Sequence, residues 1–504
     1  MKKIFLASLL VLGLAATSCD DYLDINQDPN SPTEENMTPN MMLPAAEMNI
    51  AHSYGDYLRT VGGYFAQHYS QEFGTSNYLD YSEFRQSAVR SSSMYRQLNT
   101  RALNNIKYIR DYAEQHEEWG NYLAATVLRA FTYQLLVDCY GEVPYSEALD
   151  LNNLTPAYDD GQVVYDGILA ELDDALSRVS AGDQVATSLL FPGGNANAWI
   201  QFANALKLRI LTRESGVKDV NGQIGALISQ NNFPTADVEF AGCWKNEAGQ
   251  ANPFFLEDAF SDYGASQINI ILNVALLNTM EGSNDTRLEA YFAPNGDGEY
   301  KGGVSGTNFS TTNNYKTSYW CRPNAHFDDP VVMISLSEIN FLIAEYYAKN
   351  NNASKAQEYY TSAIKASFDR ANRLATAHKE PAVDMAGVNA VLAAYPLNLS
   401  NYKRAIGIQK WVDLSGYNSF EAWCEMRRLG YPEMSNVTGE QVYNPSTDNY
   451  NPDAVAAGTL YHPINVNPAL TGILQRFPYA ENSANRNQNT PTYPGDNAPV
   501  FWAK

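Results

Sequence analysis

"SEINFLIAEYYAKNN", residues 337–351, and "SKAQEYYTSAIKASFDRA", residues 354–371, together predict a pair of helices. Small and apolar residues recur every three or four positions in each stretch, as they do on the buried face of a helix. The first stretch carries Phe341, Ala344, Glu345 and Ala348, and the second carries Ala356, Tyr359, Tyr360, Ala363 and Ile364. Small side chains at these offsets allow two antiparallel helices to approach closely.

This helix pair resembles a tetratricopeptide repeat, in which stacked helical hairpins build a scaffold. Only one pair is evident in the sequence, so the number of repeats does not follow from it. Two further stretches extend the helical pattern. "NYLAATVLRAFTYQLLVDCYGEVPYSEAL", residues 121–149, predicts a buried helix that ends at Gly141, with Pro144 just beyond, and its apolar face consists of Leu123, Val127, Phe131 and Leu135.

"NANAWIQFANALKLRILTR", residues 195–213, predicts another helix, with Asn197 as its N-terminal cap. Its apolar stripe consists of Trp199, Phe202, Ala203, Leu206 and Ile210, and Lys207, Arg209 and Arg213 lie off that stripe. We expect Trp199, and likewise Trp423 in a later helix, to belong to the core because each lies on an amphipathic stripe.

Long stretches between these helices carry few helix-forming residues. Residues 231–265, 291–330 and 431–504 are dense in Asn, Gly, Pro, Asp and Tyr. Loops of this length in a compact protein are usually functional. The sequence therefore predicts a mainly α protein with function on its loops.

The charge balance limits the classes of ligand. The formal net charge of the 504 residues is −22, and no cluster of Lys and Arg is visible, which argues against nucleic acid as a partner. Tyrosine is abundant, with 34 Tyr against 20 Phe and 7 Trp. Tyr offers a flat apolar face with a polar tip, which suits partly polar ligands, although most of these residues are expected to pack between helices.

The N-terminus predicts export. Residues 1–18 combine Lys2 and Lys3 with an apolar run over residues 4–16 and small residues after it, as in a signal peptide. Cys19 follows at once, and we expect it to carry a lipid after cleavage. Residues 19–40 are acidic and rich in proline, which predicts an exposed tether, and residues 41–504 are expected to form a single domain.

The tether also spaces Asp24, Asn26, Asp28 and Glu35 as ligands are spaced in a calcium-binding EF-hand loop. The sixth position of such a loop needs Gly, and here it is Pro29, whose ring fixes a negative φ. The acidic residues are therefore interpreted as part of an export signal and of the tether that follows the lipid-bearing cysteine.

Seven stretches, in this order, resemble the SusD/RagB family of outer-membrane lipoproteins. They are "CDDYLDINQDPNSPT", "LRAFTYQLLVDCYGEVPYSEAL", "WIQFANALKLRILTR", "NDTRLEAYFAP", "PVVMISLSEINFLIAEYYAKN", "EAWCEMRRLGYPE" and "RFPYAENSANRN". The resemblance implies a tetratricopeptide-like helical scaffold with irregular ligand-binding loops, anchored on the outer face of the outer membrane. It also implies a binding protein and not an enzyme, which captures oligosaccharides, or in some members peptides, and delivers them to a SusC-like TonB-dependent transporter.

Two clusters have the aromatic and planar polar side chains that sugar binding requires. The first is in "FGTSNYLDYSEF", residues 73–84, and supplies Phe73, Tyr78 and Tyr81 as ligand-binding candidates. The second is in "NNYKTSYWCRPNAHF", residues 313–327, and supplies Tyr315, Tyr319, Trp320 and Arg322. The alternative for Trp320 is that it anchors its loop to the scaffold.

Catalytic and metal motifs are not apparent. The sequence has no G-x-S-x-G, phosphate-loop or H-E-x-x-H motif, so no catalytic residue, metal ligand or cofactor is predicted. "PNGDGEY", residues 294–300, favours a tight turn, with a structural calcium ion as the alternative. A surface glycoside hydrolase, a peptide-binding lid and a purely structural lid remain alternative functions.

Of the five cysteines, Cys139 and Cys424 lie in helical apolar contexts and are expected to be buried free thiols. No disulfide pairing of Cys139, Cys243, Cys321 and Cys424 can be assigned from the sequence.

Overall fold

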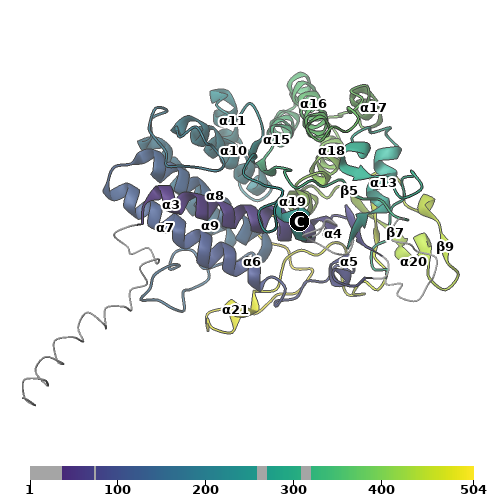
Figure 1. Ribbon diagram of the computed structural model, residues 1–504, viewed down its shortest axis with the longest axis horizontal. Coiled ribbons are helices and arrows are strands. Elements are labelled where there is room, and N and C mark those ends of the chain that lie inside the picture. The colour runs from purple at the N-terminus through teal and green to yellow at the C-terminus, as the bar shows by residue number, and fades with distance from the viewer. Residues whose placement is uncertain (1–36, 73–74, 258–268, 308–318, 504) are drawn as a thin grey trace, which may run out of the picture.

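The computed structural model describes residues 37–72, 75–257, 269–307 and 319–503. These residues form a mainly helical protein, with short strands among the loops at one side (Figure 1). The longer helices are α3 (Pro39–His52), α7 (Leu103–Gln115), α8 (Trp119–Tyr140), α9 (Gly161–Arg178), α10 (Ala196–Glu214), α11 (Asn221–Gln230), α13 (Val274–Glu281), α15 (Leu336–Lys349), α16 (Ala353–Ala377), α17 (Gly387–Ala394), α18 (Tyr402–Ser415) and α19 (Ser419–Leu429).

Shorter helical segments connect them. They are η3 (Ser53–Leu58), α4 (Arg59–Phe65), α5 (Leu79–Ser82), α6 (Ser92–Arg96), η4 (Gln97–Ala102), α12 (Pro253–Glu257), α14 (Leu288–Tyr291), α20 (Gly439–Val442), η5 (Pro452–Ala454) and α21 (Glu481–Ala484). The strands are β1 (Tyr69–Gln71), β2 (Val238–Phe240), β3 (Ile270–Leu272), β4 (Phe292–Ala293), β5 (Arg322–Pro323), β6 (Val331–Ile334), β7 (Glu433–Thr438), β8 (Tyr443–Asn444), β9 (Asn449–Tyr450) and β10 (Thr459–His462).

The strands pair two by two in the described residues and form no larger sheet. The pairs β1–β3, β2–β6, β4–β5 and β8–β9 are antiparallel, and β7–β10 is parallel. The β1–β3 and β2–β6 pairs join segments that are far apart in the chain, such as Tyr69 and Leu272, whereas β8 and β9 form a local hairpin. Their role is to hold loops in fixed positions.

The predicted helix pair is confirmed as α15 and α16. Ala344, Ala348, Ala356 and Ala363 are all buried, and their small side chains allow the two helices to pack closely. Phe341 closes the contact with Tyr360, their ring centroids 6.1 Å apart. A tetratricopeptide-like hairpin is thus part of the scaffold.

The ends of two other predicted helices are set by single residues. Gly141 ends α8 with a φ of +82°, in the positive region that glycine adopts without strain, as the sequence predicts. The cap of α10 is Asn195, whose side chain accepts from the N–H of Asn197. The prediction of Asn197 as the cap was wrong by two residues, because the side-chain oxygen of Asn195 already caps the first turn.

Three consecutive helical segments, α3, η3 and α4, carry the chain from residue 39 to residue 65. At 1.5 Å per residue this run is about 40 Å long. It crosses the molecule from the side of α7 and α9 to the side of α5 (Figure 1). The helix α3 begins at Pro39, two residues before the predicted start of the domain.

Large aromatic side chains fill the core between the helices. Trp199 and Trp423 are both fully buried, as the sequence predicts. Cys139 and Cys424 are buried free thiols, as expected, and Cys243 and Cys321 are free as well. No helix among the described residues is both long and apolar enough to cross a membrane.

Candidate functional site

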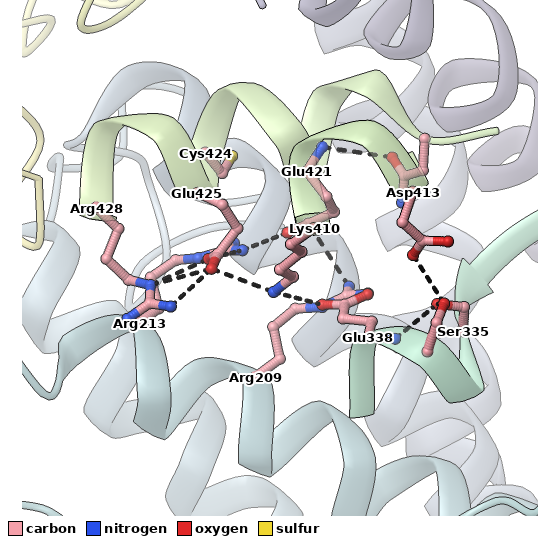
Figure 2. Close-up of polar contacts among 12 residues, drawn as sticks. Arg209, Arg213, Ser335, Glu338, Lys410, Asp413, Glu421, Cys424, Glu425 and Arg428 are labelled. Atoms are coloured by element: carbon pink, nitrogen blue, oxygen red, sulfur yellow. Dashed lines mark hydrogen bonds and ion pairs between the residues drawn. The ribbon is translucent and has the colours of Figure 1, made fainter. Parts of the chain in front are cut away.

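One region rich in polar side chains is an ionic network in the core. Arg209 and Arg213 lie one turn apart on α10 and face Glu421 and Glu425, one turn apart on α19 (Figure 2). None of these four side chains is more than 4% exposed. Spacing of four residues places like charges on one face of a helix, which destabilises that helix unless a partner carries the opposite charge.

Further residues complete this buried ionic network. The guanidinium of Arg209 binds Glu338 at 2.7 Å, and that of Arg213 binds Asp138 at 2.5 Å. Lys410 lies 3.2 Å from Glu425, and Arg428 pairs with both Glu345 and Glu425, at 2.6 and 2.7 Å. The network therefore joins α8, α10, α15, α18 and α19.

The carboxyl groups of this network differ in their protonation. Burial alone would raise the pKa of Glu425, but the charges of Arg428 and Lys410 outweigh it and hold that pKa well below its usual range. The pKa of Asp138 is raised, because burial outweighs the attraction of Arg213. Perturbed carboxyl groups often mark active sites, but these side chains lie in the core. We assign the network to the scaffold.

The second region is the loop face, made of the described residues of 69–82, 269–273, 301–307 and 319–323. Strand β3 lies at its centre and pairs with β1 on one side. On the other side, the N–H of Leu272 donates to the carbonyl oxygen of Cys321 at 2.8 Å. The two predicted clusters therefore lie on opposite sides of one strand, although more than 200 residues separate them in the chain.

Asn273 fastens these segments to one another. Its side-chain amide donates to the hydroxyl oxygens of Ser70 and Ser305, each at 2.8 Å, and lies 3.1 Å from that of Tyr461. Its carbonyl oxygen caps α13 by accepting from the N–H of Ala275 at 2.8 Å. The side chain is fully buried, so it positions the loop face from beneath.

The predicted ligand-binding residues differ in exposure. Tyr78 and Tyr319 are partly exposed, and Arg322 is exposed. Tyr81 and Trp320 are buried, with 2% and 3% of their surfaces exposed. Phe73, Tyr315 and the lipidation candidate Cys19 lie outside the described residues.

The buried aromatic residues support the partly exposed ones. Tyr78 stacks on Tyr81, with ring centroids 5.7 Å apart and planes 15° apart. Tyr319 meets Trp320 edge to face at 4.6 Å, and Trp320 meets Tyr450 in the same way at 5.8 Å. Trp320 thus anchors its loop, the alternative that the sequence left open, and its contact with any ligand stays a prediction.

Sequence reasoning missed two residues of the loop face. Asn273 directly precedes the apolar run of α13, which is the usual signal of a helix cap, but its bonds to other loops have no local signal. Glu72 follows β1 and is 3% exposed, and burial raises its pKa to about 7. A carboxyl group that titrates near neutrality therefore borders the first cluster.

The turn at residues 294–300 and two histidines are candidate metal ligands. "PNGDGEY" forms the predicted turn, in which the side chain of Asn295 accepts from the N–H groups of Asp297 and Glu299. His326 and His378 stack with ring centroids 3.7 Å apart, and each meets a carboxylate. Within the described ranges, no group of three or more such side chains has a geometry that would hold a metal ion.

Comparison with known proteins establishes the family. Residues 29–450 match the SusD-like model described as "Starch-binding associating with outer membrane", and the chain belongs to this SusD/RagB family. No curated protein matches the sequence.

Solved structures agree in fold. A chitin-binding protein is 20% identical, with a TM-score of 0.72 over 92% of this chain and 100% of that one. A SusD homolog from Bacteroides uniformis is 21% identical, with a TM-score of 0.67 over 92% and 99%. A SusD/RagB family protein from Bacteroides thetaiotaomicron is 18% identical, with a TM-score of 0.70 over 92% and 99%.

Proposed function

We propose that this protein is a cell-surface glycan-binding lipoprotein that captures oligosaccharides and passes them to a SusC-like TonB-dependent transporter. In this proposal, lipid on Cys19 anchors the chain to the outer membrane, and the protein faces the exterior of the cell. Membership of a family described as starch-binding and associated with the outer membrane supports glycan binding and this location.

The observation that carries the proposal is the loop face. It presents partly exposed aromatic side chains on loops that strand pairing and Asn273 hold in place. Aromatic rings suit the apolar face of a sugar ring, and fixed loops bind with a small loss of conformational entropy. We assign Tyr78, Tyr319 and Arg322 to ligand contact. Tyr81 and Trp320 support them from beneath, and their own contact with the ligand stays a proposal. Phe73 and Tyr315 stay proposed contacts.

Titration calorimetry with oligosaccharides tests this assignment. The panel holds maltohexaose, xylohexaose and a hexamer of N-acetylglucosamine, the last because one similar structure is a chitin-binding protein. The Tyr319→Ala variant should lose about tenfold in affinity for the sugar that binds, the size expected for a stacking contact. Tyr347→Ala is the matched control, because Tyr347 is a partly exposed tyrosine on α15. Equal losses in the two variants would refute the assignment.

The same samples separate the alternative functions. A binding protein should release no reducing ends from these sugars, whereas a glycoside hydrolase would release them. If the protein bound peptides and none of the sugars, its function would be peptide capture instead of glycan capture. Affinity should be unchanged by EDTA, because the proposal requires no cofactor, and a loss would point to a structural calcium ion.

The transporter and the anchor have their own test. The full-length protein should co-purify from outer membranes with a TonB-dependent barrel and should label with a palmitate analogue. Cys19→Ser should abolish the label. A Cys19→Ser protein that still labels and stays in the membrane would refute the lipid anchor.

A further inference from the structure

A groove lies at the other end of the α3–α4 helical run, away from the loop face. It has a volume of about 500 Å³ and lies between the start of α3, the end of α7, the start of α8 and the loop at residues 183–186. This volume falls within the range of small-ligand sites. The helical run of residues 39–65 separates it from β1 of the loop face.

Side-chain hydrogen bonds hold the loop that forms one wall of the groove. Asn121 accepts from the N–H of Ala186, and Asn40 accepts from that of Thr187, at 2.7 and 2.8 Å. Next along the loop, the carboxyl group of Glu47 accepts from the hydroxyl of Ser188 and the N–H of Leu189, both at 2.6 Å. Successive residues are thus fastened to helices, and the groove is formed before any ligand arrives.

Two aromatic residues line the groove. Trp119 and Tyr112 are both partly exposed. The guanidinium of Arg178 lies 5.0 Å from the Trp119 ring, and Tyr122 meets that ring edge to face at 5.9 Å, which fixes the indole. Tyr112 stacks on His116 with ring centroids 4.0 Å apart. Rings held in this way lose little entropy when a ligand packs on them.

The polar side chains of the groove restrict the charge of a ligand. Glu117, Glu118 and Asp183 supply carboxylates, and Asn40 and Gln184 supply amides. The described lining includes no Lys, Arg or His, and Arg178, which lies over the Trp119 ring, is already paired with Glu114 and Asp174. Phosphate, sulfate or uronate groups would therefore be repelled. The acidic residues 20–35 of this same chain are disfavoured as occupants for the same reason.

We propose that this groove is a second saccharide site, which binds an uncharged sugar unit through Trp119, Tyr112 and the carboxylates of Glu117 and Asp183. Fixed aromatic rings would contact the apolar face of the sugar, and carboxylates and amides would accept from and donate to its hydroxyls. A long glycan held here and at the loop face would gain affinity through the high effective concentration of its second contact.

Hydrogen exchange on the whole protein tests this proposal directly. Maltohexaose, xylohexaose and the N-acetylglucosamine hexamer are added one at a time, with a hexamer of galacturonate as the acidic probe and trilysine as the cationic peptide probe. At least one uncharged hexamer should protect peptides that cover residues 37–42, 115–122 and 181–188. The galacturonate hexamer and trilysine should leave them unchanged. No protection there by any uncharged probe, or protection by either charged probe alone, would overturn the proposal.

Two variants give the test a second readout. In Trp119→Ala, the sugar concentration needed to protect the groove peptides should rise about tenfold. The concentration needed to protect the loop-face peptides 75–82 should be unchanged. Trp119→Phe keeps an aromatic ring and should restore most of the affinity if the alanine variant folds poorly. Loss of loop-face binding with intact groove binding would refute the proposed function alone, so the two failures are distinguishable.

Discussion

The buried ionic network and the loop face are both built from residues far apart in the chain, but they differ in what they reveal. The stretches that resemble the SusD/RagB family supply most of the network: Asp138, Arg209, Arg213, Glu338, Glu345, Glu421, Glu425 and Arg428. The predicted ligand-binding residues all lie outside those stretches. The family resemblance is thus carried by the scaffold, and the ligand has to be inferred from elsewhere.

Glu421→Ala should cause the largest loss of stability, because it removes the carboxylate at the centre of the buried ionic network. It leaves Arg209 and Arg213 short of a carboxylate inside the core. Removing one partner of a buried ion pair costs about 3–5 kcal/mol, so the free energy of unfolding in urea should fall by that amount. A loss below about 1 kcal/mol would contradict the scaffold assignment, because it would mean that the arginines find water or other partners.

Glu47 sharpens the comparison because it is as buried as Glu425 but is bound only by neutral groups. Burial raises its pKa to about 7, whereas the pKa of Glu425 is lowered. Between pH 4.5 and 7 the folded protein keeps a proton on Glu47 that the unfolded chain releases. Stability from this group therefore decreases as the pH rises, by on the order of 3 kcal/mol.

Urea unfolding at pH 5 and pH 7.5 measures this slope. Glu47→Gln should make the loss of stability between these two pH values smaller than in the unmodified protein. Glu425 acts in the opposite direction, since its contribution is present at neutral pH and is lost only as the pH falls below about 4.5. An identical slope in Glu47→Gln and the unmodified protein would show that Glu47 ionises normally.

Asn273→Ala tests the loop face in the same way that Glu421→Ala tests the network. It removes the amide that joins Ser70 to Ser305, which should cost about 1–3 kcal/mol of unfolding free energy. It should also weaken glycan binding, because both clusters lose a shared support. Glu421→Ala, by contrast, should keep its glycan affinity at temperatures where it stays folded. If both variants lose affinity equally, the two regions are not separable.

The smallest effect is expected on the surface. Lys107 and Asp111 form an ion pair one turn apart on α7, and both side chains are about half exposed. Solvent screening makes such a pair worth less than about 0.5 kcal/mol. Asp111→Asn should therefore leave the urea midpoint nearly unchanged. A shift as large as that of Asn273→Ala would show that side-chain exposure does not predict the stability contribution of this ion pair.

The helical scaffold could be predicted from the sequence because its signals are local. Periodic small residues predicted the α15–α16 pair, and Gly141 predicted the end of α8. Amphipathic helical stripes predicted the burial of Trp199 and Trp423 in the core. Arg209 and Arg213 were assigned no role beyond lying off the apolar stripe of α10. Their partners Glu338 and Glu421 lie more than 100 positions away, so no local pattern reveals them.

The loop face was predicted less completely for a related reason. Aromatic content located the two clusters, but exposure of each ring depends on which distant segment covers it. Trp320 is buried against Tyr450, which lies 130 positions later in the chain. The groove at Trp119 had no sequence signal, since its lining comes from four separate segments.

The free thiols have a practical consequence. No disulfide joins Cys139, Cys243, Cys321 and Cys424, so the described fold requires no oxidative cross-linking step to mature. Production in a reducing cytosol should therefore give the same tertiary structure as export to an oxidising compartment. Burial raises the pKa of Cys139 far above its usual range and that of Cys243 to about 11, which leaves little reactive thiolate at neutral pH. A cysteine engineered at either proposed ligand site would then react with a fluorescent maleimide in preference to these four.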